Sequence, residues 1–297
     1  MSGPDPAVPA LRLRFDAPPP LLPAYARALL ARRPALGAGA PDMPAIEAWV
    51  SLPPLARRRT EAYRQVCGFA PGGALPLTYP HVLAMPLHLA MLTAPAFPLR
   101  VLGLVHVRNR IERLRPVAPE QALELRCLLP GLRETERGHE FDLLTEVHQA
   151  GALVWSETSG FLARRRESKR AGAPPGADAG LPARRQTREW RAAANIGRRY
   201  ARVSGDLNPI HLAGWSARLF GFPRAIAHGM WSLAHAAALI EADAQASITS
   251  IDVSFKGPML LPALVHQHTW AEAGGTRLVL TDHQDGKPYL SGGYVLG

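Results

Sequence analysis

Alternating apolar and polar positions divide this chain into two similar series of predicted strands. Four segments in each half alternate in this way, with turn residues between them: 102–114, 122–129, 139–148, 152–162, 248–255, 264–271, 277–282 and 289–296. Short segments at this spacing are typical of an antiparallel sheet.

A stretch that is apolar without alternation precedes each series of strands. In the first half it covers 82–93, and in the second it runs from Ile226 to about Ala242. Alanine and leucine dominate the part after Gly229 and proline is absent from it, which predicts a helix. Three earlier segments are predicted as a loose arm, a short helix and a loop, at 1–22, 23–33 and 34–44.

The order of these signals indicates two copies of one folding unit. Tyr63, Val66 and Gly68 recur at identical spacing around Tyr200 and Gly205, ahead of the apolar stretch in each half. Repeated order at a long period indicates repeated structure. A sheet wrapped around one apolar helix is a hotdog unit. We therefore expect an α+β protein with a double hotdog fold, two antiparallel sheets each wrapped on a central helix.

The two copies imply a division into domains. Residues 164–183 read RRRESKRAGAPPGADAGLPA, and their glycine and proline content predicts a linker. An N-terminal degenerate hotdog domain is expected at 1–163 and a C-terminal catalytic one at 184–297. The basic cluster at 164–170 is interpreted either as a contact for the phosphates of a ligand or as the solvated end of a strand.

Composition narrows the class of protein. The 297 residues are 47% hydrophobic and 20% charged, which indicates a globular chain with ample core. Two cysteines suit a reducing cytoplasm, and a cytoplasmic location is predicted. The net charge of +10 raises the possibility of a nucleic-acid-binding protein, but no nucleic-acid motif accompanies it. With no run of 18 apolar residues, no membrane helix is expected.

Candidate chemistry concentrates between Tyr200 and Met230, where the chain reads YARVSGDLNPIHLAGWSARLFGFPRAIAHGM. Asp206 and His211 are five residues apart in a segment that Gly205 and Pro209 keep from being one continuous helix. A loop of this kind can bring carboxylate and imidazole onto one small volume. Such a pair can hold a water and act as base and acid.

The start of the predicted helix at Gly229 offers a second chemical element. The first amides of a helix lack partners inside it, and the helix dipole there favours negative charge. Gly229 has no Cβ and allows the closest backbone approach. A carbonyl oxygen that gains charge during a reaction would be stabilised at this point.

The whole string resembles the signature of the (R)-specific enoyl-CoA hydratase, or MaoC-like dehydratase, family. The matching positions are Tyr200, Ser204, Gly205, Asp206, Asn208, Pro209, Ile210, His211 and Ala217, followed by a similar block at Gly221-Phe222 and Ile226-Ala227-His228-Gly229-Met230. The chain departs from the family at Ala213, where many members carry an acid or asparagine.

The resemblance implies a hydro-lyase in fatty-acyl metabolism. It would hydrate trans-2-enoyl thioesters to (R)-3-hydroxyacyl thioesters, or catalyse the reverse dehydration, with no cofactor and no metal. Asp206, His211 and Gly229 are expected to be catalytic, and Asn208, Ser232 and His228 to bind substrate. The substrate would be a thioester of coenzyme A or acyl carrier protein, and the protein a monomeric double hotdog or a homodimer.

The first copy is predicted to lack catalytic activity. Phe69 stands where Asp206 stands in the second copy, and Met85-Pro86 is expected near the position of Gly229. Three histidines, His81, His88 and His106, have no acid at useful spacing and are interpreted as structural. The first copy would complete the sheet and shape the site for the acyl chain.

Two further functions fit the same fold. In a thioesterase, Asp206 would activate water towards the thioester carbonyl, and release of free thiol would reveal that reaction. A non-catalytic acyl-thioester-binding subunit would need neither Asp206 nor His211, so the presence of both favours an enzyme.

Overall fold

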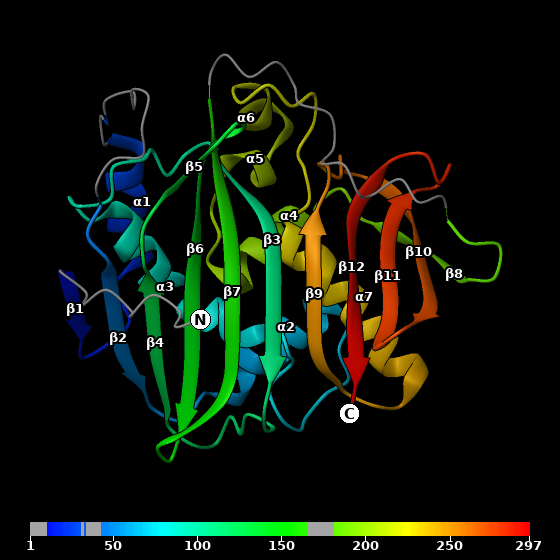
Figure 1. Ribbon diagram of the computed structural model, residues 1–297, viewed down its shortest axis with the longest axis horizontal. Coiled ribbons are helices and arrows are strands. Elements are labelled where there is room, and N and C mark those ends of the chain that lie inside the picture. Colours follow the sequence, from blue (N-terminus) through cyan, green and yellow to red (C-terminus); the bar gives the residue numbers. More distant parts are fainter. Residues whose placement is uncertain (1–10, 31–32, 34–42, 166–180) are drawn as a thin grey trace, which may run out of the picture.

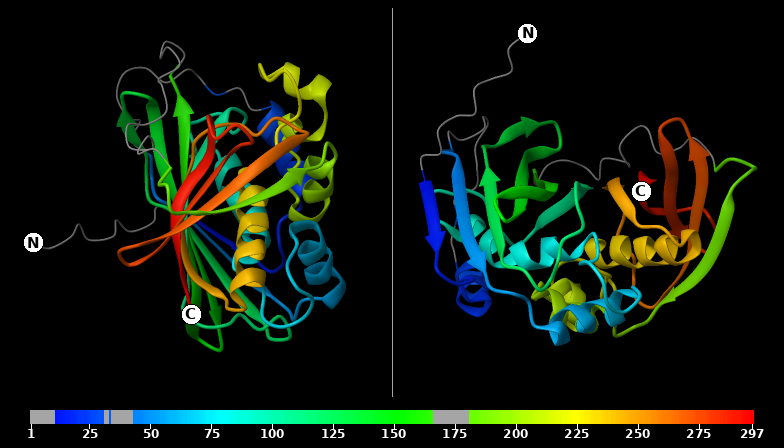
Figure 2. Two further views of the ribbon diagram at one scale, coloured as in Figure 1. Left: turned by 90° about the vertical axis from the view of Figure 1, so that its right-hand side faces the viewer. Right: turned by 90° about the horizontal axis from the view of Figure 1, so that it is seen from below.

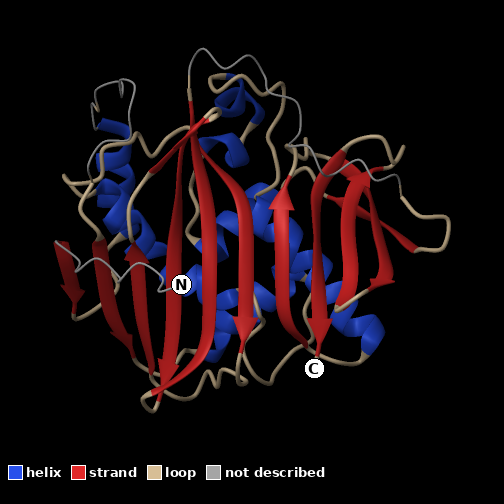
Figure 3. Cartoon of the chain, in the orientation of Figure 1, coloured by secondary structure: helices blue, strands red, loops and turns tan. Residues whose placement is uncertain are grey.

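Twelve strands form one sheet in the described part of the chain, and the helices cover one of its faces (Figures 1 and 2). The structure is a computed structural model that describes residues 11–30, 33, 43–165 and 181–297. Helices and strands are distinguished by colour in Figure 3.

Each half has its own set of elements. The first half contains β1 (Leu11–Phe15), α1 (Leu21–Leu30), β2 (Ile46–Leu52), α2 (Arg57–Cys67), α3 (Tyr79–Thr93), β3 (Leu104–Arg113), β4 (Leu123–Leu129), β5 (Arg133–Thr135), β6 (Gly138–Gln149) and β7 (Ala152–Arg164). The second contains β8 (Gln186–Ala192), α4 (Ile196–Ser204), α5 (Pro209–Leu212), α6 (Gly214–Arg218), α7 (Gly229–Ala244), β9 (Ile248–Phe255), β10 (Ala263–Glu272), β11 (Gly275–Asp282) and β12 (Pro288–Leu296).

The sheet order is β1-β2-β4-β6-β7-β3-β9-β12-β11-β10-β8, with β5 paired to β6. Each half wraps its strands around one apolar helix, α3 or α7, which confirms the predicted double hotdog. The two predicted sheets are joined edge to edge, because β3 pairs antiparallel with β9, Ile111 opposite Ile251. All eight predicted strands are present with small shifts at their ends.

The prediction of a loose arm at 1–22 was wrong for the part that the structure describes. Leu11–Phe15 alternates apolar and polar positions and pairs parallel with β2, and α1 begins at Leu21. Residues 1–10, 31–32 and 34–42 lie outside the described residues, as does most of the predicted linker at 166–180.

The internal repeat is confirmed at the ends of α2 and α4. Gly68 and Gly205 each follow a helix in the left-handed conformation, with φ of 92° and 74°. Each amide donates to the carbonyl four residues earlier, a common way to end a helix with glycine. The rings of Tyr63 and Tyr200, buried on these helices, lie 6.2 Å apart. Phe69 therefore occupies the position that Asp206 occupies in the second half.

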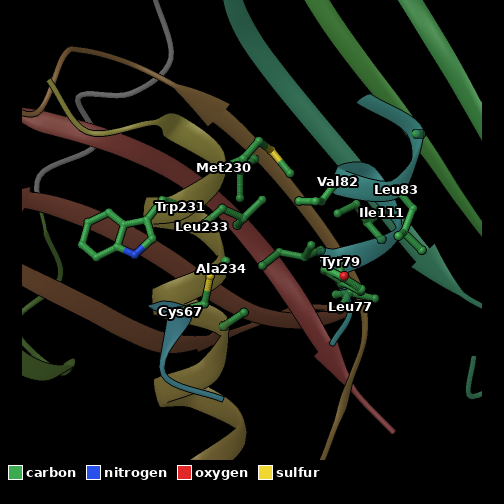
Figure 4. Packing of buried hydrophobic residues seen from close by; sticks show 14 of the residues in the cluster. Cys67, Leu77, Tyr79, Val82, Leu83, Ile111, Met230, Trp231, Leu233 and Ala234 are labelled. Carbon is green, nitrogen blue, oxygen red and sulfur yellow. The ribbon is translucent and has the colours of Figure 1, made fainter. Parts of the chain in front are cut away.

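The cores of the two halves merge into one buried cluster. Met230 of α7 and Val82 of α3 extend toward each other where the central helices approach (Figure 4). Because the position of Gly229 corresponds to the first residue of α3, Tyr79 stands there, and the alignment with Met85-Pro86 was wrong. Among the described helices none has the length and hydropathy to cross a membrane.

Candidate active site

Asp206 is held in the loop between α4 and α5 by short-range hydrogen bonds. Its amide donates to Ser204 Oγ at 3.1 Å, and its Oδ1 accepts from the Asn208 amide at 3.1 Å. The carboxylate accepts a hydrogen bond from the backbone amide two residues later, and this local bond stabilises the turn. The Asp206 side chain remains 27% exposed, so its carboxylate is open to a small molecule.

Tyr25 of α1 contacts the same loop, and no sequence pattern predicted this contact. Its hydroxyl accepts from the Leu207 amide at 2.9 Å and lies 3.1 Å from the Gly205 carbonyl and 3.4 Å from Asp206 Oδ1. A single tyrosine in a helix 181 residues from Asp206 carries no recognisable signal. The first half thus contributes a hydroxyl to the loop.

His211 lies on the short helix α5, which Asn208 and Pro209 begin. The Asn208 side-chain oxygen accepts from the Ile210 amide at 3.4 Å, so this side chain acts as a helix cap. His211 Nδ1 lies 2.9 Å from the Ile226 carbonyl, which can only accept. The proton of a neutral His211 therefore sits on Nδ1, and Nε2 offers a lone pair.

His228 contacts both His211 and Asp206. Its ring stacks on that of His211 with 3.7 Å between ring centroids, and its Nε2 donates to the Asp206 carbonyl at 3.2 Å. The His228 side chain is only 2% exposed. Sequence reasoning proposed it as a substrate contact, whereas the structure places it against the two catalytic candidates.

The predicted pairing of Asp206 with His211 is realised in space. A carboxylate oxygen of Asp206 and a ring nitrogen of His211 lie within 4.8 Å of each other. Hydrogen bonds to water span about 2.7–3.0 Å, so one water fits between two acceptors at such a distance. This distance suits a single water that bridges the two groups.

The protonation states suit this role. Burial raises the pKa of Asp206, but His228, His211 and the Asn208 amide outweigh it and hold that pKa below its usual value. Burial lowers the pKa of His211, and the Asp206 charge offsets this only in part. At neutral pH the pair is an ionised carboxylate beside a neutral imidazole, two groups that can each accept a hydrogen bond from a water.

Gly229 begins α7, as predicted, beside the aromatic ring of Phe255 on β9. A Cβ at Gly229 would lie 2.9–3.3 Å from three atoms of that ring. The remaining predicted residue, Ser232, donates its hydroxyl to the His228 carbonyl at 3.2 Å and is buried. Its hydroxyl is thereby used within the helix.

Sequence spacing suggested no metal ligand set, but folding brings two groups together among the described residues. One is Asp206, His211 and His228, and the other is His266, His268 and Asp285. In the first, His228 Nε2 faces a carbonyl oxygen and so carries a proton, which leaves Nδ1 as the only nitrogen of that ring able to bind a metal. In the second, His268 Nδ1 lies 3.2 Å from Arg185 Nε, a donor that places the imidazole proton on Nε2, towards Asp285.

The interpretation that the first-half histidines have no acid was wrong for His81. Its Nδ1 lies 2.9 Å from both carboxylate oxygens of Glu157, which is 76 residues away on β7. The signal was available, because Glu157 alternates with Trp155 and Ser159 on the inward face of a strand. A carboxylate at an inward position needs a partner.

Comparison with known proteins agrees with the geometry of the site. Residues 172–282 match the family described as MaoC like domain. A Mycobacterium tuberculosis protein named 3-hydroxyacyl-thioester dehydratase X is 34% identical over 244 residues, 80% of this chain and 85% of that protein.

Solved structures agree as well. The crystal structure of HtdX from M. tuberculosis is similar with a TM-score of 0.71 and 32% identity, over 84% of this chain and 100% of that one. Another M. tuberculosis protein, described as having a double hotdog fold, gives a TM-score of 0.55 at 13% identity over 91% and 98% of the two chains. At that identity the second likeness concerns the fold alone.

Proposed function

Because this chain belongs to the MaoC-like dehydratase family, we propose that it interconverts trans-2-enoyl thioesters and (R)-3-hydroxyacyl thioesters by adding or removing water. The observation that carries the proposal is the approach of Asp206 and His211 to within 4.8 Å, as an ionised carboxylate and a neutral imidazole. The handedness of the product rests on the family resemblance.

In the hydration direction, a water between Asp206 and His211 directs its two hydrogens at the two acceptors. As its oxygen bonds to C3 of the substrate, one proton passes to the pair and the π electrons of the C2=C3 bond move towards the thioester carbonyl. The pair then returns a proton to C2, so the reaction consumes one water and leaves the enzyme unchanged.

The enolate-like oxygen formed in this step needs a donor. We assign that role to the amide of Gly229, because the first amides of α7 have no partner inside the helix and the dipole of α7 favours negative charge there. Coenzyme A and acyl carrier protein are both suitable carriers of the thioester.

The proposed domains follow the two copies. Residues 1–163 would form a degenerate hotdog that carries Phe69 in place of the aspartate, and 184–297 the catalytic one, with a linker at 164–183. A single chain then contains both halves of a hotdog pair, as a monomer or as half of a homodimer.

The test is an assay with trans-2-butenoyl-CoA. Loss of the conjugated enoyl chromophore with formation of (R)-3-hydroxybutyryl-CoA, resolved from the (S) isomer by chiral chromatography, is the expected result. Release of free thiol without hydration would identify a thioesterase instead. No reaction with CoA or acyl-carrier-protein thioesters would overturn the proposal and favour an acyl-binding subunit.

A further inference from the structure

The short helix α6 has its small residues buried and its large apolar residues exposed. Ser216 and Ala217 form the buried side of the helix, and the Ser216 hydroxyl donates to the Pro209 carbonyl at 2.7 Å. Trp215 is 71% exposed and Leu219 is 77% exposed. The packing of α6 therefore uses neither large side chain, although the burial of apolar surface is the main force that stabilises a fold.

A third exposed apolar residue, Phe220, follows α6 directly and is 38% exposed. Trp215 and Phe220 are the only exposed tryptophan and phenylalanine among the described residues. Trp215 and Leu219 are four residues apart and so lie on the same side of the helix. We call these three residues the α6 patch. An exposed apolar patch of this kind generally marks an interaction site.

The α6 patch lies next to the proposed catalytic residues. Helix α6 packs against α5, which carries His211, and the two helices lie together above α4 in the view of Figure 1. Trp215 follows His211 by four residues. Helix α4, which leads into Asp206, contacts the same region, because Arg198 Nη1 donates to the Leu212 carbonyl at 3.1 Å. A partner bound to the α6 patch would thus lie beside the Asp206–His211 pair.

The segment that contains the α6 patch is strongly basic. Between residues 195 and 230 the chain has five arginines and a single acid, Asp206, which belongs to the site itself. All five arginines are exposed, and they are Arg198, Arg199, Arg202, Arg218 and Arg224. None of the five forms an ion pair with a carboxylate among the described residues. The uncompensated charge fits an acidic partner.

The charge and the apolar side chains together narrow the choice of partner. A second copy of this chain fits poorly, because a symmetric contact between two α6 patches would bring arginines against arginines. Coenzyme A offers phosphates to the arginines but no surface that could cover three apolar side chains. An acyl carrier protein is a small acidic protein with apolar surface residues, and it carries a thioester on a flexible arm.

We propose that the α6 patch and the arginines around it form a docking surface for an acyl carrier protein, which delivers the thioester to Asp206 and His211. The inference rests on the proposed hydratase function and names the carrier that this function left open. Tryptophan and arginine are also the residues that most often dominate the affinity of protein interfaces.

The test compares kcat/KM for a trans-2-butenoyl group on a bacterial acyl carrier protein and on coenzyme A. Trp215→Ala and Leu219→Ala should each lower kcat/KM for the carrier-protein thioester by roughly 10-fold, mainly through KM. Both should leave kcat/KM for the CoA thioester unchanged. Leu114→Ala is the matched control, since Leu114 is 56% exposed at the end of β3 in the other half, and it should leave both values unchanged.

The charge is tested separately. Arg218→Glu should raise KM for the carrier-protein thioester and weaken its dependence on salt, because rim charges act mainly on association. Arg12→Glu, on the edge strand β1, is the control and should leave KM unchanged.

Several results would overturn the inference. Equal losses with the two thioesters would show that the α6 patch acts on the site itself, and no loss with the carrier-protein thioester would show that it binds no carrier. A change in oligomeric state on Trp215→Ala, measured by sedimentation velocity, would identify a contact between copies. Loss of binding to phosphatidylglycerol vesicles in that variant would identify a membrane surface. A wild-type enzyme that hydrates neither thioester would instead contradict the proposed function.

A measurement without kinetics addresses the same surface. Tryptophan emission moves to shorter wavelength when an exposed ring becomes buried. Addition of the acyl carrier protein to the wild-type enzyme should produce this shift, and Trp215→Phe should abolish it. A shift that persists in Trp215→Phe, or no shift in the wild type at saturating carrier protein, would exclude Trp215 from the contact.

Discussion

A Cβ added to Gly197 would lie 2.0 Å from the carbonyl oxygen of His211. Helix α4 therefore packs directly on the backbone of His211, and glycine is required for that contact. His211 can take up its observed position only because residue 197 has no side chain.

Gly197→Ala should displace α5 and misplace His211. We expect an overpacking cost of about 1–3 kcal/mol in the free energy of unfolding, together with a fall in kcat. Urea unfolding and steady-state hydration kinetics measure the two effects. Gly214→Ala is the control, since a Cβ there would meet no atom within 4 Å. Equal activity and stability in the two variants would contradict the packing argument.

Removing either member of the acid–base pair should abolish most of the turnover. Asp206→Asn and His211→Ala should each lower kcat by roughly 10²–10⁴-fold, the usual contribution of positioned proton transfer. Circular dichroism and thermal unfolding should show an intact fold. Near-normal turnover in either folded variant would remove that residue from the mechanism.

Tyr25→Phe tests whether α1 supports the catalytic loop. The variant leaves the Leu207 amide without its partner and frees the Asp206 loop on one side. A lost hydrogen bond of about 0.5–1.5 kcal/mol corresponds to a fall in kcat of roughly 2–13-fold. The exposed Leu29 lies on the same helix, and Leu29→Ala should leave kcat unchanged. Equal kinetics for the two variants would argue against a role for Tyr25.

Gly229→Val tests the oxyanion site at the start of α7. Blocking an amide donor of this kind should lower kcat by roughly 10²–10³-fold, with a smaller effect on binding of a saturated acyl-CoA inhibitor. The added side chain also presses on Phe255, so Gly229→Val should be combined with Phe255→Ala. The double variant should regain stability without regaining turnover. Recovery of both stability and turnover would show that steric pressure on Phe255 explains the fall in kcat.

Acid should destabilise the protein through its buried neutral histidines. Burial, with smaller effects of neighbouring imidazoles, lowers the pKa of His88 and of His228 to about 3, against about 6.5 in an unfolded chain. Between these values the unfolded state binds more protons, so stability falls as the pH falls. By the same comparison of folded and unfolded states, the contribution of Glu157 to the free energy of unfolding is constant above about pH 4.5. The contribution of His81 is constant below about pH 6.5.

Urea unfolding from pH 6 to 4.5 measures this slope. His88→Gln should reduce it by about 1.4 kcal/mol per pH unit, the value for one proton. Leu29→Ala, which removes an exposed side chain that does not titrate, should leave the slope unchanged. An unchanged slope in His88→Gln would mean that His88 titrates normally in the folded state.

Local patterns predicted most of the fold. Alternation located eight strands to within a few residues, and the recurrence of Tyr63 and Gly68 at Tyr200 and Gly205 located the second copy. The strand at 11–15 was missed because the prolines around so short a segment resemble an irregular arm. Its partner, β2, follows only after α1 and an intervening segment, and pairing over that distance leaves no local signal.

In the site, too, contacts between residues close in sequence could be predicted and contacts between distant residues could not. Asp206 and His211 are close in sequence, so spacing and turn residues predicted their meeting. The contacts of Tyr25 with Asp206 and of His81 with Glu157 join residues 181 and 76 positions apart, and only tertiary packing creates them. The support of His211 by the ring of His228 is likewise a property of the folded chain.

The two edge strands of the sheet affect whether copies of this molecule can pair through their strands. Strands β1 and β8 are the edge strands of the sheet. The unpaired backbone groups of an edge strand can pair with a strand from another molecule. Both strands carry exposed arginines, Arg12 and Arg14 on β1 and Arg188 and Arg191 on β8. Charged side chains on both edge strands disfavour the addition of a further strand at either end of the sheet.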